Sequence, residues 1–323
     1  MDEPVTTMLT SMLHVGIATF MKSPYVPLDK LRDVKADVAF LGAPFEQCCC
    51  GIPGASFGPR VLRQASDDLM TYNLELDLDL ADHIKMVDVG DAPSIPGSVE
   101  LSHKNIEDGV AAICRAGAFP VTMGGDHSIT LPSFKGFYRE SKAKKFGVIQ
   151  IDTHQDFADE YGGQKISNCT QMTRISEMDR VDPHNMVQIG MRNMLAPKEE
   201  IVRSRKAGVT TFFIWDVFKR GIEDVTREAV KIARNGTDAL YLTVDIDCLD
   251  AAYAPATSVP TPGGLTSRQL IEAVRIIGKS GIDAFDLSEV SGPNQDSNLI
   301  TARAGATVIA ELIGAKVYGK LHK

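Results

Sequence analysis

The sequence contains no apolar run long enough to cross a lipid bilayer and no block of consecutive basic residues. A transmembrane helix needs about 20 apolar residues, so a membrane-spanning protein is not expected. The 34 lysines and arginines are outnumbered by 42 acidic residues, which gives a formal net charge of -8. Because nucleic-acid-binding proteins carry a basic patch, neither a nucleic acid nor a membrane is predicted as a partner.

The N-terminal segment lacks the features of a secretory signal peptide. Residues 1–3 are acidic, and the apolar stretch 8–20 is interrupted by Ser11 and His14. A signal peptide has a basic beginning followed by an unbroken apolar segment. We therefore expect a cytoplasmic protein.

The six cysteines show neither a disulfide framework nor the spacing of a zinc site. Three of them, Cys48, Cys49 and Cys50, are consecutive, and adjacent cysteines rarely form structural disulfides. The other three lie in or beside apolar runs, and no second pair of cysteine or histidine residues stands at zinc-site spacing. Free thiols in a reducing compartment are the preferred interpretation.

Eight short apolar runs alternate with amphipathic segments, and the runs predict strands. The predicted strands are 37–41, 84–89, 119–123, 146–151, 186–189, 209–214, 240–244 and 282–287. The predicted helices are 59–70, 102–116, 131–141, 222–233, 267–279 and 301–313. This alternation is typical of a parallel sheet covered by helices on both faces. With no linker or internal repeat, we expect an N-terminal arm over residues 1–35 and a single α/β domain over residues 36–323.

Polar clusters follow three of the predicted strands. They are GGDHS, with Asp126 and His127; DTHQD, with Asp152, His154 and Asp156; and DID, with Asp245 and Asp247. Each cluster alone fits a helix N-cap or a solvated loop. In parallel sheets, however, ligands collect at the carboxyl ends of the strands. Two histidines and several carboxylates at one such edge need a cation, because unpaired buried carboxylates are costly.

Six of these side chains offer nitrogen or oxygen ligands, which is too many for one first-row metal ion that keeps a water molecule. They are His127, Asp152, His154, Asp156, Asp245 and Asp247. They suit two ions that share bridging carboxylates. Mn²⁺ is the first candidate for oxygen-rich ligation with some imidazole, with Ni²⁺, Co²⁺ or Fe²⁺ as alternatives. Two such ions would hold a bridging hydroxide, a nucleophile at neutral pH, so hydrolysis is the predicted reaction class.

The motifs GGDHS, DTHQD, DIDCLDAAYAPATSVPTPGG and DLSEVSGP, with GAPFE and PGASFGPRVLR upstream, resemble those of the ureohydrolase family of arginases and agmatinases. The resemblance extends from about Asp37 to the C-terminus. It implies a three-layer α/β/α fold with an eight-stranded, mainly parallel sheet. It also implies a binuclear manganese site on the six ligands, trimers or hexamers, and hydrolysis of a guanidino group to urea and an amine. In such an enzyme Asp156 would pass a proton to the leaving amine, and Glu289 would pair with the planar guanidinium.

The sequence departs from the family pattern on the substrate side. Asn168 and Cys169 stand where most members have a His-Gly pair, and asparagine cannot titrate although it can still hydrogen-bond. The other replacements are Thr153 for alanine, Ala251 for proline, and Ser258-Val259 for a Gly-Thr step. These changes predict a reshaped pocket in which Asn168 and Glu289 contact the substrate.

The segment FADEYGGQKIS after Asp156 lacks the pattern with which arginases hold the α-amino acid part of arginine, so arginine is not the expected substrate. Candidates are agmatine, guanidinobutyrate, guanidinopropionate, free guanidine, and N-substituted guanidines or biguanides. Resemblance to guanidine and metformin hydrolases keeps Ni²⁺ as a candidate metal. Three alternatives stay open: an agmatinase proper, a hydrolase of a formimidoyl substrate that releases an amide, and a structural or regulatory subunit in a hetero-oligomer with a related subunit.

Overall fold

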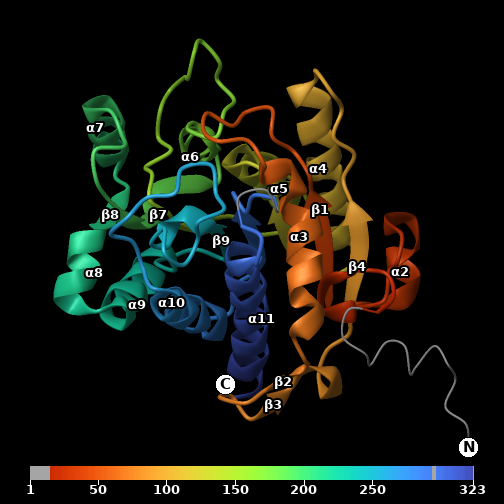
Figure 1. Cartoon of the computed structure of the whole chain (residues 1–323). Helices are drawn as coiled ribbons and strands as arrows, with labels where there is room; N and C mark the ends of the chain where they lie inside the picture. The colour runs from red at the N-terminus through yellow and green to blue at the C-terminus, as the bar shows by residue number, and fades with distance from the viewer. Residues whose placement is uncertain (1–14, 293–295, 323) are drawn as a thin grey trace, which may run out of the picture.

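The computed structural model describes residues 15–292 and 296–322, and these residues are arranged around one sheet of eight parallel strands (Figure 1). The strand order is β4-β1-β5-β10-β9-β6-β7-β8. The strands are β1 (Val38–Ala43), β4 (Met86–Asp91), β5 (Phe119–Gly124), β6 (Phe146–Ile151), β7 (Val181–Met191), β8 (Thr210–Phe213), β9 (Ala239–Asp245) and β10 (Ala284–Ser288). Each of the eight predicted apolar runs supplies one of these strands, so the predicted sheet is confirmed.

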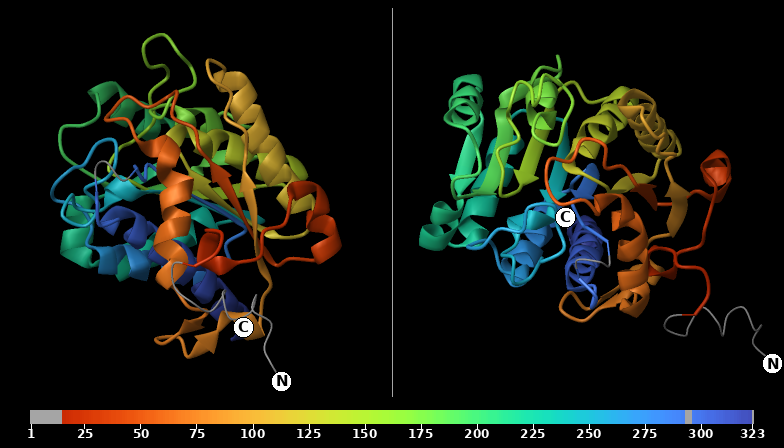
Figure 2. Two further views of the ribbon diagram at one scale, coloured as in Figure 1. Left: turned by 45° about the vertical axis from the view of Figure 1, so that its right-hand side comes forward. Right: turned by 45° about the horizontal axis from the view of Figure 1, so that its top comes forward.

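Helices cover both faces of the sheet and complete three layers. The helices are α2 (Leu31–Val34), α3 (Gly58–Ala65), α4 (Val99–Arg115), α5 (Thr130–Glu140), α6 (Gln171–Ser176), α7 (Lys198–Ala207), α8 (Ile214–Arg220), α9 (Ile222–Ala233), α10 (Ser267–Lys279) and α11 (Ile300–Leu321). The two further views show helices on both sides of the sheet (Figure 2). One apolar cluster joins the sheet to α3, α9, α10 and α11, and a second joins its other face to α4, α5 and α6. Side chains alternate across a strand. Tyr241 and Leu242 therefore enter opposite clusters.

Several short elements were not predicted. They are α6, α7, α8 and a two-stranded hairpin of β2 (Tyr72–Asn73) and β3 (Leu78–Asp79). Of the ten residues of α7 only Ser204 is buried, so its sequence has no apolar stripe to signal a helix. Helix α11 is longer than predicted, and α3 is shorter. Within the described ranges, no helix is both long enough and apolar enough to span a membrane.

Residues 15–35 of the predicted N-terminal arm pack against the rest of the chain, where Phe20 and Leu31 are buried. Residues 1–14 of that arm lie outside the described residues. The division between an arm and a domain at residue 36 stays a prediction.

Asp88 in β4 connects this N-terminal segment, the sheet and α3. Its carboxylate accepts the backbone N–H of Phe20 at 2.9 Å. It also accepts two hydrogen bonds from the Arg63 guanidinium, at 2.8 and 3.0 Å. Both charged side chains are buried, and the guanidinium has one further carboxylate partner, the partly exposed Asp91. Removing one member of a buried ion pair is costly because the other charge stays buried.

We expect Asp88→Ala to lower the free energy of unfolding by about 3 kcal/mol, because Arg63 loses its bidentate partner. Urea unfolding followed by circular dichroism measures this change. The matched control is Asp29→Ala, which removes an exposed aspartate beside Lys30 and should change the free energy by less than about 0.5 kcal/mol. Equal unfolding midpoints for the two variants would contradict the role given to Asp88.

Candidate metal centre and substrate pocket

The predicted ligands and Glu289 lie at the carboxyl ends of four neighbouring strands. Strands β5, β10, β9 and β6 are adjacent in that order. His127 follows β5, Glu289 follows β10, Asp245 ends β9, and residues 152–156 follow β6. Because the strands are parallel, these segments meet at one edge of the sheet. The structure therefore brings all six predicted ligands together, whereas Asp126 caps the turn that carries His127 by accepting the N–H of Ser128.

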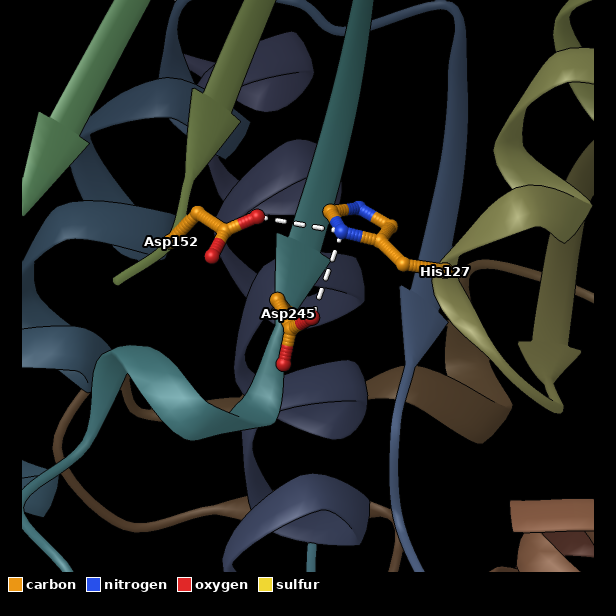
Figure 3. A group of neighbouring side chains, drawn as sticks. All are labelled: His127, Asp152 and Asp245. Carbon is orange, nitrogen blue, oxygen red and sulfur yellow. Dashed lines mark ion pairs between the residues drawn. The ribbon is translucent and has the colours of Figure 1, made fainter. Parts of the chain in front are cut away.

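His127 approaches three carboxylates through one ring nitrogen. Its Nδ1 lies 3.0 Å from Asp152 Oδ2, 2.8 Å from Asp156 Oδ2 and 3.2 Å from Asp245 Oδ2. Figure 3 shows the side chains of His127, Asp152 and Asp245 pointing toward one another. Nδ1 is buried but makes no directed hydrogen bond to any of these oxygens. The ligand atoms of His127, Asp152 and Asp245 are close enough together to hold a metal ion.

Asp152, His154 and Asp247 form a second group that could hold a metal ion. His154 Nδ1 lies 3.5 Å from Asp152 Oδ1 and 3.1 Å from Asp247 Oδ2. Asp152 thus belongs to both groups and presents one carboxylate oxygen to each. A shared carboxylate suits a pair of neighbouring divalent ions, and every ligand atom in the two groups is nitrogen or oxygen.

The cluster carries more negative charge than its own residues neutralise. Asp152, Asp156, Asp245 and Asp247 are at most 4% exposed, and within the described residues their ion-pair partners are the two histidines. Burial and neighbouring carboxylates raise the pKa of Asp156 and of Asp245 well above the usual range. Burial disfavours charge on the histidines, but the adjacent carboxylates outweigh it and raise the pKa of both. Bound cations would relieve this repulsion.

Asp156 and Glu289 both have left-handed backbone conformations, with φ of 51° and 63°. For residues other than glycine such a conformation costs about 1–3 kcal/mol and persists only where the surrounding structure enforces it, as at many functional sites. Specific contacts hold both carboxylates in place. Gln171 Nε2 donates to Asp156 Oδ2 at 2.5 Å, and the N–H of His127 donates to Glu289 Oε1 at 2.8 Å. Nothing in the sequence predicted these conformations.

Buried polar residues beneath the cluster orient its members. Thr243 Oγ1 lies 2.9 Å from His127 Nε2 and donates to Asp286 Oδ1 at 2.7 Å. Gln150 Nε2 donates to Asp152 Oδ2 at 2.6 Å. Such outer partners fix the orientation of a histidine or carboxylate ligand. The sequence analysis missed Thr243, Asp286 and Gln150, although each is a polar residue inside an otherwise apolar strand, which is the signal that could have found them.

A pocket of about 510 Å³ gives access to the cluster. The predicted site residues in its lining are His154, Asp156, Asn168, Asp245, Asp247 and Glu289. Asn168 Nδ2 lies 3.4 Å from Glu289 Oε1, so the two predicted substrate contacts face the same space. Among the described residues, Glu289 Oε2 is buried and has no hydrogen-bond partner. The pocket therefore presents an unpaired carboxylate oxygen beside the metal-binding groups.

Some of the residues that depart from the family pattern line the pocket, and others do not. Cys169, Ser258 and Val259 line the pocket, so these replacements do shape its wall. Thr153 is buried beneath it and donates its hydroxyl to the Asp247 carbonyl at 2.7 Å. Ala251 is not in the lining.

Comparison with known proteins agrees with this geometry. The model of the arginase family matches residues 36–314. A guanidinobutyrase from Pseudomonas aeruginosa is 33% identical over 300 residues, with 92% of each chain covered. A formimidoylglutamase from Halalkalibacterium halodurans is 34% identical over 280 residues, which cover 85% of this chain and 86% of the relative. The structure of proclavaminate amidino hydrolase from Streptomyces clavuligerus superposes with a TM-score of 0.87 at 27% identity, covering 95% of this chain and 99% of that one. The chain therefore belongs to the arginase family, as its motifs predicted.

Proposed function

We propose that the protein is a binuclear metal-dependent amidinohydrolase that hydrolyses a guanidino compound other than arginine to urea and an amine. The observation that carries this proposal is the pair of ligand groups that share Asp152. One ion would be held by His127, Asp152, Asp156 and Asp245, and the other by Asp152, His154 and Asp247. The buried, unbonded Nδ1 of His127 among carboxylate oxygens supports this assignment.

The ligand set favours Mn²⁺ and leaves Ni²⁺ as the alternative, because it combines many carboxylate oxygens with two imidazoles and no thiolate. When bound, a pair of such ions supplies a water molecule that is activated as a nucleophile at neutral pH. The protein's own residues bind the substrate, exclude water and move the proton. A cytoplasmic location, and assembly as a trimer, a hexamer or a hetero-oligomer with a related subunit, remain predictions.

Glu289 is the residue that we assign to the substrate guanidinium. It is 1% exposed, burial raises its pKa, and Oε2 has no hydrogen-bond partner within residues 15–292 and 296–322. A planar guanidinium offers two parallel N–H donors and a positive charge, which such a carboxylate accepts best. The amide of Asn168 is placed to hydrogen-bond to the same group. Asp156 lines the same pocket and would take the proton from the attacking water and return it to the leaving nitrogen.

The remaining charged residues of the pocket favour a substrate whose tail is positive or neutral. They are Asp159, Glu160, Glu199, Glu200 and Arg203. Asp159 is already paired with Lys165 and Arg174. Glu200 is partly buried in this lining, where its ionised carboxylate would repel a carboxylate on the substrate tail and attract a cation. N-substituted guanidines, biguanides and agmatine are therefore favoured over guanidinobutyrate and other guanidino acids.

A formimidoyl substrate is the second candidate, because the 34% identical relative is named a formimidoylglutamase. Such a substrate would release an amide instead of urea. Its glutamate part carries two carboxylates, which the acidic pocket lining disfavours. A purely structural or regulatory subunit is a weaker alternative, because the six proposed ligands lie together and four of them line an accessible pocket with Glu289.

The proposed function is tested by urea release from the purified protein loaded separately with Mn²⁺ and Ni²⁺. The panel contains free guanidine, dimethylguanidine, a biguanide, agmatine, guanidinobutyrate and arginine. We expect urea from a member with a positive or neutral tail, and none from arginine. Amide release from formimidoylglutamate would instead support the second candidate. No product from any compound, with two metal ions bound per chain, would contradict catalysis by this chain alone.

Asp247→Ala should remove one of the two bound ions and lower turnover by at least about 10³-fold, since a ligand and its negative charge are lost. Metal analysis by mass spectrometry after desalting measures the stoichiometry separately from activity. Asp29→Ala is the exposed control and should keep both ions. Normal metal content in Asp247→Ala would show that the second ligand group is wrongly assigned.

Glu200→Gln should reverse the preference among substrate tails, since it removes one negative charge from the pocket lining. We expect KM for agmatine to rise about tenfold, which corresponds to about 1.4 kcal/mol, and KM for guanidinobutyrate to fall. Glu100→Gln, an exposed substitution at the start of α4, is the matched control. If both variants keep the KM values of the parent protein, the pocket carboxylates do not select the tail.

A further inference from the structure

The run Cys48-Cys49-Cys50 lies in the loop after β1, and its three thiols have different surroundings. Cys50 Sγ lies 3.7 Å from Cys169 Sγ, in the segment before α6. Cys48 Sγ instead contacts the carbonyl of Ile166, and Cys49 Sγ accepts the N–H of Gly51. All six cysteines are free thiols. Cys50 and Cys169 are therefore a close thiol pair formed by residues 119 positions apart in the sequence.

Both members of this pair belong to the wall of the substrate pocket. Cys50 is exposed and Cys169 is partly buried, so small molecules that enter the pocket can reach them. Cys169 directly follows Asn168, and its thiol also lies 3.5 Å from Asn168 Oδ1. The pair is thus connected to a predicted substrate contact, although neither sulfur belongs to the two metal-binding groups.

We propose that Cys50 and Cys169 are a covalent modification site, a dithiol that low-molecular-weight disulfides oxidise to an intramolecular disulfide across the pocket wall. The sulfur–sulfur distance must shorten from 3.7 Å to about 2.05 Å. Side-chain rotation and a small movement of the two loops supply this change. The bond would join the loop after β1 to the segment before α6.

The two neighbouring cysteines of the run are less suited to this reaction. A hydrogen bond from the Cys169 thiol lowers the pKa of Cys50 to about 6, so Cys50 reacts as a thiolate at neutral pH. Burial and nearby carboxylates raise the pKa of Cys48 and of Cys49 to about 12. The short distance to Cys169 and the lowered pKa therefore both identify Cys50 as the reactive cysteine of the run.

The oxidation proceeds by two thiol–disulfide exchanges. With oxidised glutathione, the Cys50 thiolate attacks one sulfur atom and releases one glutathione thiolate. Cys169 then loses its proton, attacks the Cys50 sulfur and releases a second glutathione. The two protein thiols lose two electrons, the glutathione disulfide gains them, and the two protons end on the two glutathione molecules.

The disulfide would disturb substrate binding through Asn168. Asn168 loses the nearby thiol of Cys169, and its backbone is drawn toward the loop after β1, away from its position 3.4 Å from Glu289 Oε1. A misplacement of about 1 Å at such a contact can cost about 100-fold in rate. We expect the oxidised protein to be at least about tenfold less active, and a dithiol reductant to restore it.

The experiment treats the full chain with oxidised glutathione and maps its cysteines by peptide mass spectrometry after alkylation. We expect loss of two of the six thiols and a single cross-link between Cys50 and Cys169. Urea release should fall at least about tenfold and recover after dithiothreitol. The cross-link can be mapped even if the protein hydrolyses no guanidino compound, so this readout is independent of the proposed function.

Three variants complete the test. Cys50→Ser should form no intramolecular cross-link and keep its activity under oxidation. Cys169→Ser should form no cross-link either, and its reaction should stop at a glutathione mixed disulfide on Cys50. Cys49→Ser, the matched control in the same run, should cross-link and lose activity like the parent protein. Six free thiols after oxidation, or a cross-link through Cys48 or Cys49, would overturn the assignment of the pair. A complete Cys50–Cys169 cross-link with full activity would overturn the proposal that this disulfide disturbs substrate binding.

Discussion

The repulsion among buried carboxylates at one edge of the sheet is the constraint on which the rest of this structure depends. Four aspartates and Glu289 lie almost completely buried, with two histidines among them. Burying so many acidic groups without compensation would destabilise the fold, so the cluster is stabilised either by protonation of some carboxylates or by bound cations. Asp152 connects the two ligand groups, because its Oδ2 lies near His127 and its Oδ1 lies near His154.

The surrounding framework holds these groups in conformations that they would not adopt alone. The left-handed backbone of Asp156 and Glu289 is kept in place by hydrogen bonds with Gln171 and with the His127 backbone. Thr243 lies between His127 and Asp286, and its hydroxyl orients the imidazole through the Nε2 atom. The strands that carry or precede these residues, β5, β6, β9 and β10, are fully buried and central in the sheet, so the strained residues are attached to well-packed backbone.

Chemistry and specificity are located in different parts of the chain. The candidate metal ligands lie at or just after the ends of strands in the centre of the sheet, whereas the pocket wall comes from loops that carry Asn168, Cys169 and Ser258 and from helix α7, which carries Glu200. Loops can change residue type without disturbing the sheet. This separation explains how one chain can keep a complete ligand set and still present an unusual wall, with a thiol pair and an acidic lining.

The eight strands and the parallel α/β architecture could be predicted from the sequence, and a candidate ligand set could be proposed from it, because apolar runs of strand length and the acidic clusters that follow them are local patterns. The sequence also identified Asn168 as a departure from the family pattern. Only the tertiary structure decided that Asp152 is shared, that Thr243, Asp286, Gln150 and Gln171 support the ligands, and that Cys50 meets Cys169. These are contacts between residues far apart in the chain. Their geometry depends on strand order and on the paths of loops, which no local sequence pattern encodes.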